Sequence, residues 1–586
     1  MGSMYLIDVD AFLLRELLIL FGQPEARGTK VLKFCNDEAT EYAILSHRWI
    51  DSTEVDYEEM IGLAKMDKQE QDGIRGRQGY KKIVNTCRRA KEDRYRWVWI
   101  DTCCIDKRSS AELSEAINSM YRWYANAKMC YAYLHDVDGS SFPTKRDDEK
   151  YHQSDGWPEW FSRGWTLQEM IAPRNLQFFD KNWQPIGDKK SLAHILERIT
   201  RVPEHILANG LERNRLCVAK IISWAAKRKT GREEDRAYSL MGLLGVNLPM
   251  LYGEGKKAFH RLQMEIVRTS DDQSIFAWGH NSNVRIGSIL ADDPDDFEGC
   301  SDMELMDHNE FINSSTDADQ DRLGVFPVTN RGIQIWMPLR RYRDSKFVFR
   351  AQLPCRDGVG VSIDLVLWNS NYYRYTSTGG AALEDSPAGF RRVYLRYQDT
   401  PNHTVTFDID DSAIIENGFT CSSAAPENLT GNTFTFTNSN SFCVKTYYHG
   451  RGNGRFKVGF GQCFGLDWVS LDVARDPGPW ICDPLQVQMP GGAPKPVEPS
   501  QVDSPGLWVC HLRLPGTTWI VRIYRIEWER SKIRLRMEVF QGSHFQVPKF
   551  RLRIQSHFQD GLNEWNAYEV EVSGSLVHVD YYHDHS

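Results

Sequence analysis

Short apolar runs alternate with amphipathic helical patterns over the first 180 residues, and this alternation constrains the fold more than any other feature. The apolar runs cover residues 42–46, 97–101, 130–134 and 176–179. Each is short and mostly apolar, the pattern of a strand that is covered on both faces. Apolar residues recur at helical spacing in the intervening segments 79–92 and 109–128. Strands that alternate with helices predict βαβ units, and hence a parallel sheet flanked by helices.

The chain of 586 residues is too long for a single hydrophobic core, so we expect several domains. We assign residues 4–210 to the α/β domain and residues 211–280 to a helical connector. Residues 281–586 alternate apolar and polar positions, which predicts an antiparallel β-rich half, either a sandwich or a barrel. The strongest alternation is at 519–528 and 532–540, which predicts a hairpin. Similar strands are expected at 347–353, 361–368, 391–397, 404–409 and 568–572.

The net charge and the cysteine content of the chain disfavour some classes of protein and favour others. The net charge of -8 argues against a general nucleic-acid binder, because phosphate contacts need clustered Lys and Arg. The 13 cysteines show no paired spacing, which favours reduced thiols in a cytoplasmic protein and gives no zinc signature. The apolar segment 13–21 is short and contains Arg15 and Glu16, so we expect no membrane span.

Polar residues follow the first two predicted strands, at the edge where parallel sheets bind ligands. Arg48 and Trp49 could grip a phosphate and stack on a base, or they could form a structural ion pair under an indole lid. His47 could act as an acid or base, or could be a hydrogen-bonded structural residue. Asp101 could accept ribose hydroxyls, or it could cap the turn that follows its strand.

A third polar cluster lies in a helix expected from residue 162 to about residue 172. Trp165 and Glu169 are four residues apart and should share a face of this helix. A carboxylate beside an indole is partly desolvated, which raises its pKa and suits it to stabilise a cationic ribose as a glycosidic bond breaks. The alternative is a structural ion pair between Glu169 and a nearby arginine, either Arg48, Arg163 or Arg174.

Three motifs resemble the HET domain of fungal heterokaryon-incompatibility proteins. They are Ala-Ile-Leu-Ser-His-Arg-Trp at 43–49, Trp-Ile-Asp-Thr-Cys-Cys-Ile-Asp at 99–106 and Arg-Gly-Trp-Thr-Leu-Gln-Glu at 163–169. They occur in the family's order, and stretches at 233–244, 251–254 and 270–278 are also typical of these proteins. HET domains in turn resemble TIR domains, since the same three motifs look like the TIR first-strand box, second-strand box and catalytic-glutamate box.

The resemblance implies a TIR-like sheet and an NAD+ nucleosidase that cleaves the nicotinamide–ribose bond. Glu169 would then be the catalytic residue. The residues expected to bind the NAD+ substrate are Ser46, His47, Arg48, Trp49, Asp101, Arg163 and Trp165. The resemblance implies no metal and no cofactor, a homo-oligomer, and NAD+ depletion that leads to cell death in fungal non-self recognition. The alternative is a non-enzymatic signalling module that oligomerises and uses the C-terminal half as a sensor for a protein partner.

Overall fold

The computed structural model forms two compact units, Met1–Asp344 with Val348–Gln398, and Ser345–Phe347 with Asp399–Ser586. The boundary near residue 398 differs from the sequence division at 280, because the first β-rich stretch after the connector belongs to the first unit. The structure describes residues 3–50, 52–139, 141–211, 216–279, 285–307, 310–311, 326–343, 348–368, 370–376, 383–385, 388–398, 404–425, 431–436, 442–450, 454–463, 466–473, 509–514, 517–529, 532–541, 551–556, 566–572 and 575–580.

The first unit is built around a seven-stranded sheet in the order β2-β1-β4-β3-β5-β6-β7. Its strands are β1 (Ser3–Asp8), β2 (Leu32–Asn36), β3 (Tyr42–His47), β4 (Trp97–Trp99), β5 (Met129–Tyr133), β6 (Leu176–Phe179) and β7 (Pro185–Asp188). The four strands predicted from apolar runs are confirmed and run parallel in the middle of the sheet. The sheet is mixed and not parallel throughout, because β1 pairs antiparallel with both β2 and β4, and β7 pairs antiparallel with β6.

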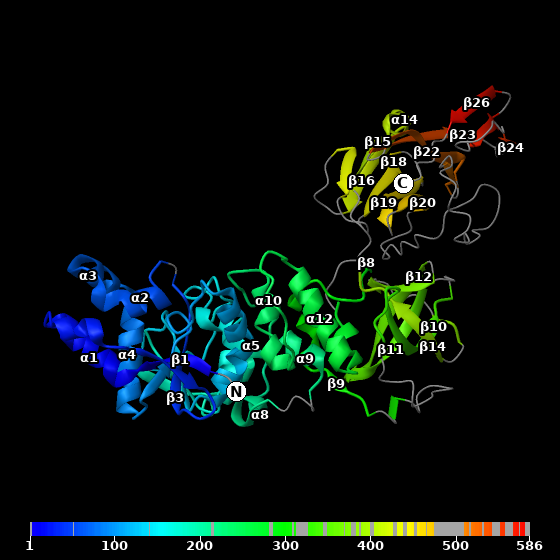
Figure 1. The fold of residues 1–586 in the computed structure, drawn as a ribbon. Helices are drawn as coiled ribbons and strands as arrows, with labels where there is room; N and C mark the ends of the chain where they lie inside the picture. The colour runs from blue at the N-terminus through cyan, green and yellow to red at the C-terminus, as the bar shows by residue number, and fades with distance from the viewer. Residues whose placement is uncertain are drawn as a thin grey trace. The chain divides into compact units, whose positions relative to one another are not determined.

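Helices flank this sheet, with α1 and α4 on one side and α5 on the other (Figure 1). The helix α4 (Gln78–Glu92) buries Tyr80, Ile83 and Cys87 at helical spacing, as its sequence predicts. The helix α5 (Ser110–Asn126) begins after Ser109, whose side chain accepts from the backbone N–H of Glu112. The other helices of this region are α1 (Val9–Leu20), α2 (Tyr57–Gly62), α3 (Lys68–Gly76), α6 (Thr166–Ile171), α7 (Ala193–Thr200) and α8 (Glu204–Asn209).

Short helices and a second sheet complete the first unit. The region predicted to be a helical connector contains α9 (Val218–Ser223), α10 (Asp235–Tyr238), α11 (Met241–Leu244) and α12 (Lys257–Thr269). The sheet that follows consists of β8 (Arg285–Gly287), β9 (Glu304–Leu305), β10 (Ile333–Arg341), β11 (Val348–Asp357), β12 (Val359–Trp368), β13 (Asn371–Thr376) and β14 (Gly389–Leu395). One buried apolar cluster runs from the first sheet through these helices into the second sheet.

The second unit contains two sheets that share one core. The five-stranded sheet has β15 (Val405–Asp410), β17 (Thr433–Phe436), β21 (Val509–Arg513), β22 (Trp519–Glu529) and β23 (Lys532–Gln541). The four-stranded sheet has β16 (Phe419–Ala425), β18 (Phe442–His449), β19 (Arg455–Cys463) and β20 (Leu466–Val473). The rings of Phe407 and Phe460 from the two sheets are 5.6 Å apart, the contact expected between sandwiched sheets.

The predicted hairpin is confirmed, since β22 and β23 pair antiparallel from Trp519↔Gln541 to Glu529↔Lys532. The chain of the second unit also forms α14 (Ser412–Glu416) and a small sheet of β24 (Arg551–Ser556), β25 (Asn566–Val572) and β26 (Ser575–Asp580). In the part of the chain that the structure describes, no helix is both long and apolar enough to cross a membrane. The same residues contain no group of three metal-ligating side chains.

Candidate functional site

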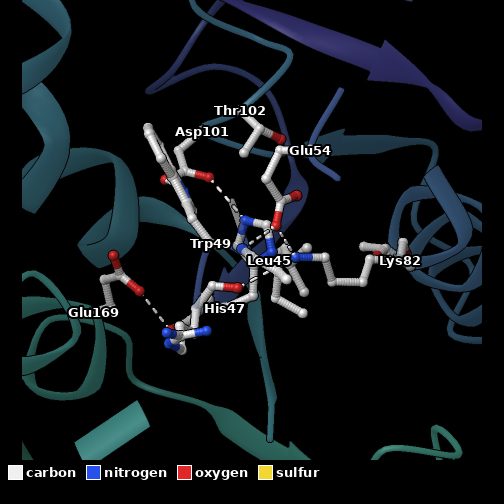
Figure 2. A network of polar contacts seen from close by, with 12 residues as sticks. Leu45, His47, Trp49, Glu54, Lys82, Asp101, Thr102 and Glu169 are labelled. Atoms are coloured by element: carbon white, nitrogen blue, oxygen red, sulfur yellow. Dashed lines mark hydrogen bonds and ion pairs between the residues drawn. The ribbon is translucent and has the colours of Figure 1, made fainter. Parts of the chain in front are cut away.

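The register of the central strands brings the first two polar clusters to one edge of the sheet. Ile44 on β3 lies opposite Trp99 on β4, and the two strands are parallel. Two residues farther along, Ser46 and Asp101 therefore reach the same edge. Figure 2 shows His47 and Trp49 turned toward Asp101, with Glu169 lying apart from these three side chains. The predicted residues thus gather at the carboxyl ends of the strands.

Glu169 is anchored to β3 through a hydroxyl group. It lies in the first turn of α6, and its Oε2 accepts a hydrogen bond of 2.5 Å from the Ser46 hydroxyl. The Trp160 indole donates to the same hydroxyl at 2.9 Å. Trp160 and Ser46 are fully buried, and Glu169 is 4% exposed. The carboxyl group therefore lies in an almost dry, aromatic surrounding with a hydroxyl as its donor.

This surrounding raises the pKa of Glu169 to about 8. Burial is the main cause, and the negative charge of Asp101 adds to it, whereas hydrogen bonds from Ser46 and Tyr124 act in the opposite direction. At neutral pH the side chain is therefore mostly protonated. The raised pKa agrees with the expectation for a carboxyl group beside an indole, but the indole that reaches the Ser46–Glu169 pair is Trp160.

Asp101 forms the centre of a second cluster. Its two carboxylate oxygens contact Nε2 of His47 at 3.0 Å and accept from the Trp49 indole at 2.7 Å. The Lys107 ammonium lies 3.9 Å from the centre of the Trp49 ring, and Trp49 is 43% exposed. Burial alone would raise the pKa of Asp101, but the hydrogen bonds and charges of His47, Lys107 and Trp49 lower it. Asp101 is thus held as an anion.

The two carboxyl groups approach β3 from opposite faces. Ser46 and His47 are neighbours in this strand, so their side chains point to opposite sides of the sheet. Ser46 contacts Glu169, whereas His47 contacts Asp101. One carboxyl group has a raised pKa and the other a lowered pKa. The two carboxyl groups therefore differ in protonation state at neutral pH.

Arg48 has a carboxylate partner, but that partner is Glu159 and not Glu169. The two side chains form an ion pair of 2.6 Å, and both are about one quarter exposed. His135 approaches the other Glu159 oxygen at 3.7 Å. The Arg48 guanidinium is therefore held in an ion pair, which was the structural alternative to phosphate binding. It lies close to solvent, one residue beyond β3.

The other two predicted residues contact neighbouring segments. The Trp165 indole is a hydrogen-bond partner of Asp235, a carboxyl group whose pKa burial raises. The charge of Arg163 lowers the pKa of Glu169, but less than the hydrogen bonds from Ser46 and Tyr124 do. The backbone carbonyl of Arg163 accepts from the guanidinium of Arg228 at 2.9 Å. Trp165 and Arg163 therefore connect the start of α6 to Asp235 and Arg228, which lie outside the Ser46–Glu169 pair.

Two buried cations hold the short helix that contains Glu169. Arg228 donates to the Thr166 hydroxyl at 3.2 Å at the start of α6, and burial lowers its pKa to about 9. Lys189 donates to the carbonyl groups of Met170 at 3.1 Å and Ile171 at 3.4 Å, and also to that of Pro173. Burial lowers the pKa of this lysine to about 8. Lys189 therefore satisfies carbonyl groups that the end of a six-residue helix leaves without partners, and Arg228 holds the Thr166 side chain at its start.

Sequence reasoning missed Trp160, Lys189 and Arg228. Trp160 precedes the third motif and lies in a 3₁₀ turn at Glu159–Ser162, outside the helix expected from residue 162. Lys189 follows β7 and Arg228 follows α9, and each is far from α6 in the sequence. No local pattern around either residue indicates its contact.

Comparisons with known proteins agree with the motifs. Residues 42–158 match the family described as Heterokaryon incompatibility protein (HET), and residues 257–286 match a Domain of unknown function (DUF8212). The chain is 42% identical over 248 residues to the Vegetative incompatibility protein HET-E-1 of Podospora anserina. The matched part is 41% of this chain and 17% of the length of that relative. No solved structure matches the chain.

Proposed function

The chain contains a fungal heterokaryon incompatibility (HET) domain, and from this premise we propose that it acts in fungal non-self recognition by cleaving NAD+ between nicotinamide and ribose. The observation that supports the proposal is the Glu169 carboxyl group, dehydrated and held by Ser46 at the sheet edge where Asp101 and His47 also lie. Loss of NAD+ would then lead to cell death.

The chemistry follows from the properties of this carboxyl group. A bound nicotinamide ribose carries a positive charge, which favours the ionised form of Glu169 and lowers its pKa from about 8. The carboxylate stabilises the positive charge that spreads over the ribose as the bond to nicotinamide breaks. Nicotinamide leaves with the bonding electrons, water adds to the ribose C1′, and the water loses a proton. The products are nicotinamide, ADP-ribose and a proton.

Neighbouring residues supply binding groups for the rest of the substrate. In this proposal the half-exposed Trp49 ring, whose indole is held by the Asp101 anion, offers a stacking surface for a base. Arg48 would contact the pyrophosphate in place of Glu159. Because Glu169 is 4% exposed, the surroundings of α6 must open before a ribose reaches it. The proposal therefore includes a substrate-dependent movement near Trp160.

A second candidate is a non-enzymatic signalling module that assembles and recruits a partner. The burial of Glu169 favours this candidate, because a protonated carboxyl group bound to Ser46 also serves as a structural hydrogen-bond partner. The ion pair between Arg48 and Glu159 favours it as well, since that contact occupies the expected phosphate-binding group.

Release of nicotinamide from NAD+ by the purified full chain tests the two candidates. We expect release by the parent protein, a loss of at least about 100-fold in Glu169→Gln and Glu169→Ala, and no change in Glu41→Gln, an exposed control. Equal release by the Glu169 variants would remove the mechanism. Absence of release over a wide range of protein concentrations would favour the signalling module. Activity on NADP+ or free nucleosides but not on NAD+ would indicate another nucleotide hydrolase.

A further inference from the structure

The Glu159 carboxylate lies where side chains from two neighbouring parallel strands converge. His47 of β3 lies opposite Tyr133 of β5. Arg48 and His135 follow these two strands, at the carboxyl edge of the sheet. One oxygen of Glu159 lies 2.6 Å from Nε of Arg48, and the other lies 3.7 Å from Nε2 of His135. A single carboxylate therefore lies between a guanidinium and an imidazole at the edge where parallel sheets bind ligands.

Glu159 is an imperfect hydrogen-bond acceptor for both groups. Within the residues that the structure describes, Nε of Arg48 and Nδ1 of His135 are buried and have no hydrogen-bond partner. The contact with Arg48 is thus an ion pair without an aligned hydrogen bond, and the contact with His135 is too long for one. The three side chains are between 22% and 27% exposed. The Glu159 side chain can therefore turn into water when a ligand offers a better acceptor.

The charges around Glu159 favour a ligand group with one negative charge. Burial lowers the pKa of His135, so its imidazole is neutral at neutral pH. Lys82 also acts on His135, but it lies in an ion pair of its own. Asp136 is fixed beside the site, because it accepts from the backbone N–H of Glu159 at 2.8 Å. A singly charged oxyanion in place of Glu159 leaves the local charge unchanged, whereas a terminal phosphate, with a charge of about -1.5 to -2, is repelled by Asp136.

An internal diphosphate has the chemistry that this position requires. Each of its phosphoryl groups carries one negative charge and, like a carboxylate, presents two oxygens to donors. Arg48 can grip both oxygens through parallel hydrogen bonds, and the neutral imidazole of His135 can donate from Nε2. Trp49 follows Arg48 in the chain, and its 43% exposed ring can stack on a base of the same ligand. A dinucleotide combines a base with an internal diphosphate.

We propose that Arg48 and His135 form a binding site for the internal diphosphate of a dinucleotide, and that Glu159 occupies this site as a competing anion until the dinucleotide displaces it. The inference rests on the proposed function for the substrate, since NAD+ is such a dinucleotide, and it adds Glu159 as the residue that limits affinity. It also adds a selection against ligands that carry a terminal phosphate. Because no bond is broken at this site, its occupancy can be measured without the reaction.

Equilibrium dialysis of ADP-ribose against the full chain tests the site, because ADP-ribose has an internal diphosphate but no nicotinamide to release. Glu159→Gln should tighten binding about 5-fold, since a partly exposed ion pair no longer has to be broken. Arg48→Gln should weaken binding at least about 10-fold, and Arg48→Lys should lie between it and the parent protein. Glu384→Gln is the matched control, because it also frees an arginine, Arg341, from a carboxylate of similar exposure (29%). We expect this control to bind ADP-ribose as the parent protein does.

Two further ligands identify the group that is bound. Adenosine has no phosphate, so its binding should not respond to Glu159→Gln, and AMP should bind more weakly than ADP-ribose because its phosphate is terminal. AMP that binds as tightly as ADP-ribose would overturn the assignment to an internal diphosphate.

The outcomes separate this inference from the proposed reaction. ADP-ribose binding that Glu159→Gln does not tighten, or no binding to the parent protein and to Glu159→Gln, would overturn the inference and leave a structural ion pair. Nicotinamide release with the same KM in the parent protein and Arg48→Gln would also overturn it, but would leave the reaction intact. Binding that Glu159 limits, without any nicotinamide release, would support the inference and remove the reaction. An unchanged thermal midpoint shows that each variant is folded.

Discussion

The Ser46 hydroxyl lies 2.5 Å from a carboxylate oxygen of Glu169 and is the donor in that contact. Trp160 donates to the same hydroxyl, so the serine accepts one hydrogen bond and gives one. This chain of donors fixes which way the serine hydrogen points and makes Ser46 the main hydrogen-bond donor to the ionised form of Glu169.

Ser46→Ala should raise the pKa of Glu169 above its value of about 8, because the substitution removes a hydrogen bond that favours the ionised form. We expect a shift of about one pKa unit, the size of a hydrogen bond to a charged group. The infrared band of the protonated carboxyl group, assigned by its loss in Glu169→Gln, reports this titration without requiring activity. Ser223→Ala, which alters another buried serine, should leave the band unchanged. An unshifted titration in Ser46→Ala would contradict the assigned contact.

Asp101→Asn should shift the same titration in the opposite direction. The negative charge of Asp101 is the second largest influence that raises the pKa of Glu169, and asparagine removes that charge. We therefore expect the carboxyl band to disappear at lower pH than in the parent protein. A shift to higher pH, or none, would show that the two carboxyl groups are not coupled across β3. Trp49 fluorescence should change as well, since its indole loses an ionised acceptor.

The stability of the first unit should depend on pH through Glu169. Its pKa is about 8 in the folded protein against 4.5 for an unperturbed glutamate, so folding favours the protonated form. This contribution is complete below pH 4.5 and is lost as the pH rises through 8. It amounts to at most about 5 kcal/mol. The glutamine in Glu169→Gln does not titrate. The free energy of unfolding of this variant in urea should therefore increase relative to that of the parent protein as the pH rises from about 5 to about 8. A constant difference between the two proteins would disprove the raised pKa.

Lys189→Met should destabilise the first unit by about 1–3 kcal/mol, because it leaves the carbonyl groups at the end of α6 without donors. The neighbouring Lys190 is exposed, and Lys190→Met provides a matched control that should change stability by less than about 0.5 kcal/mol. Urea unfolding at neutral pH measures both variants. Equal effects would show that the buried ammonium contributes nothing specific to α6.

The central sheet could be predicted from the sequence because its strands are buried on both faces. All six residues of β3 are buried, and such runs stand out as continuously apolar. The two edge strands, β2 and β7, were missed because they are partly exposed and lack such a continuous apolar run. β2 contains the exposed residues Lys33 and Phe34 and lies at the sheet edge, so its pattern does not separate it from a loop.

The sequence predicts that the candidate site lies at the ends of the strands, but it does not predict the contacts between the side chains of the site. The sequence places Ser46, His47 and Asp101 at one edge, and the parallel register brings them there. It does not determine which carboxyl group each side chain meets, because that depends on the face of β3 toward which each side chain points. The partner of Arg48 depended on a 3₁₀ turn at Glu159–Ser162, whose position no apolar period reveals.

The pairing of β5 with β6 bears on the smallest fragment that can fold. The family match ends at residue 158, before Glu169 and before β6. A polypeptide cut at that point would leave the backbone of β5 open along one side and would lack the acidic residue altogether. It would tend to aggregate, and its inactivity would carry no information about catalysis. Fragments for expression should therefore continue past Lys189, whose ammonium ties α6 to the last strand of the sheet.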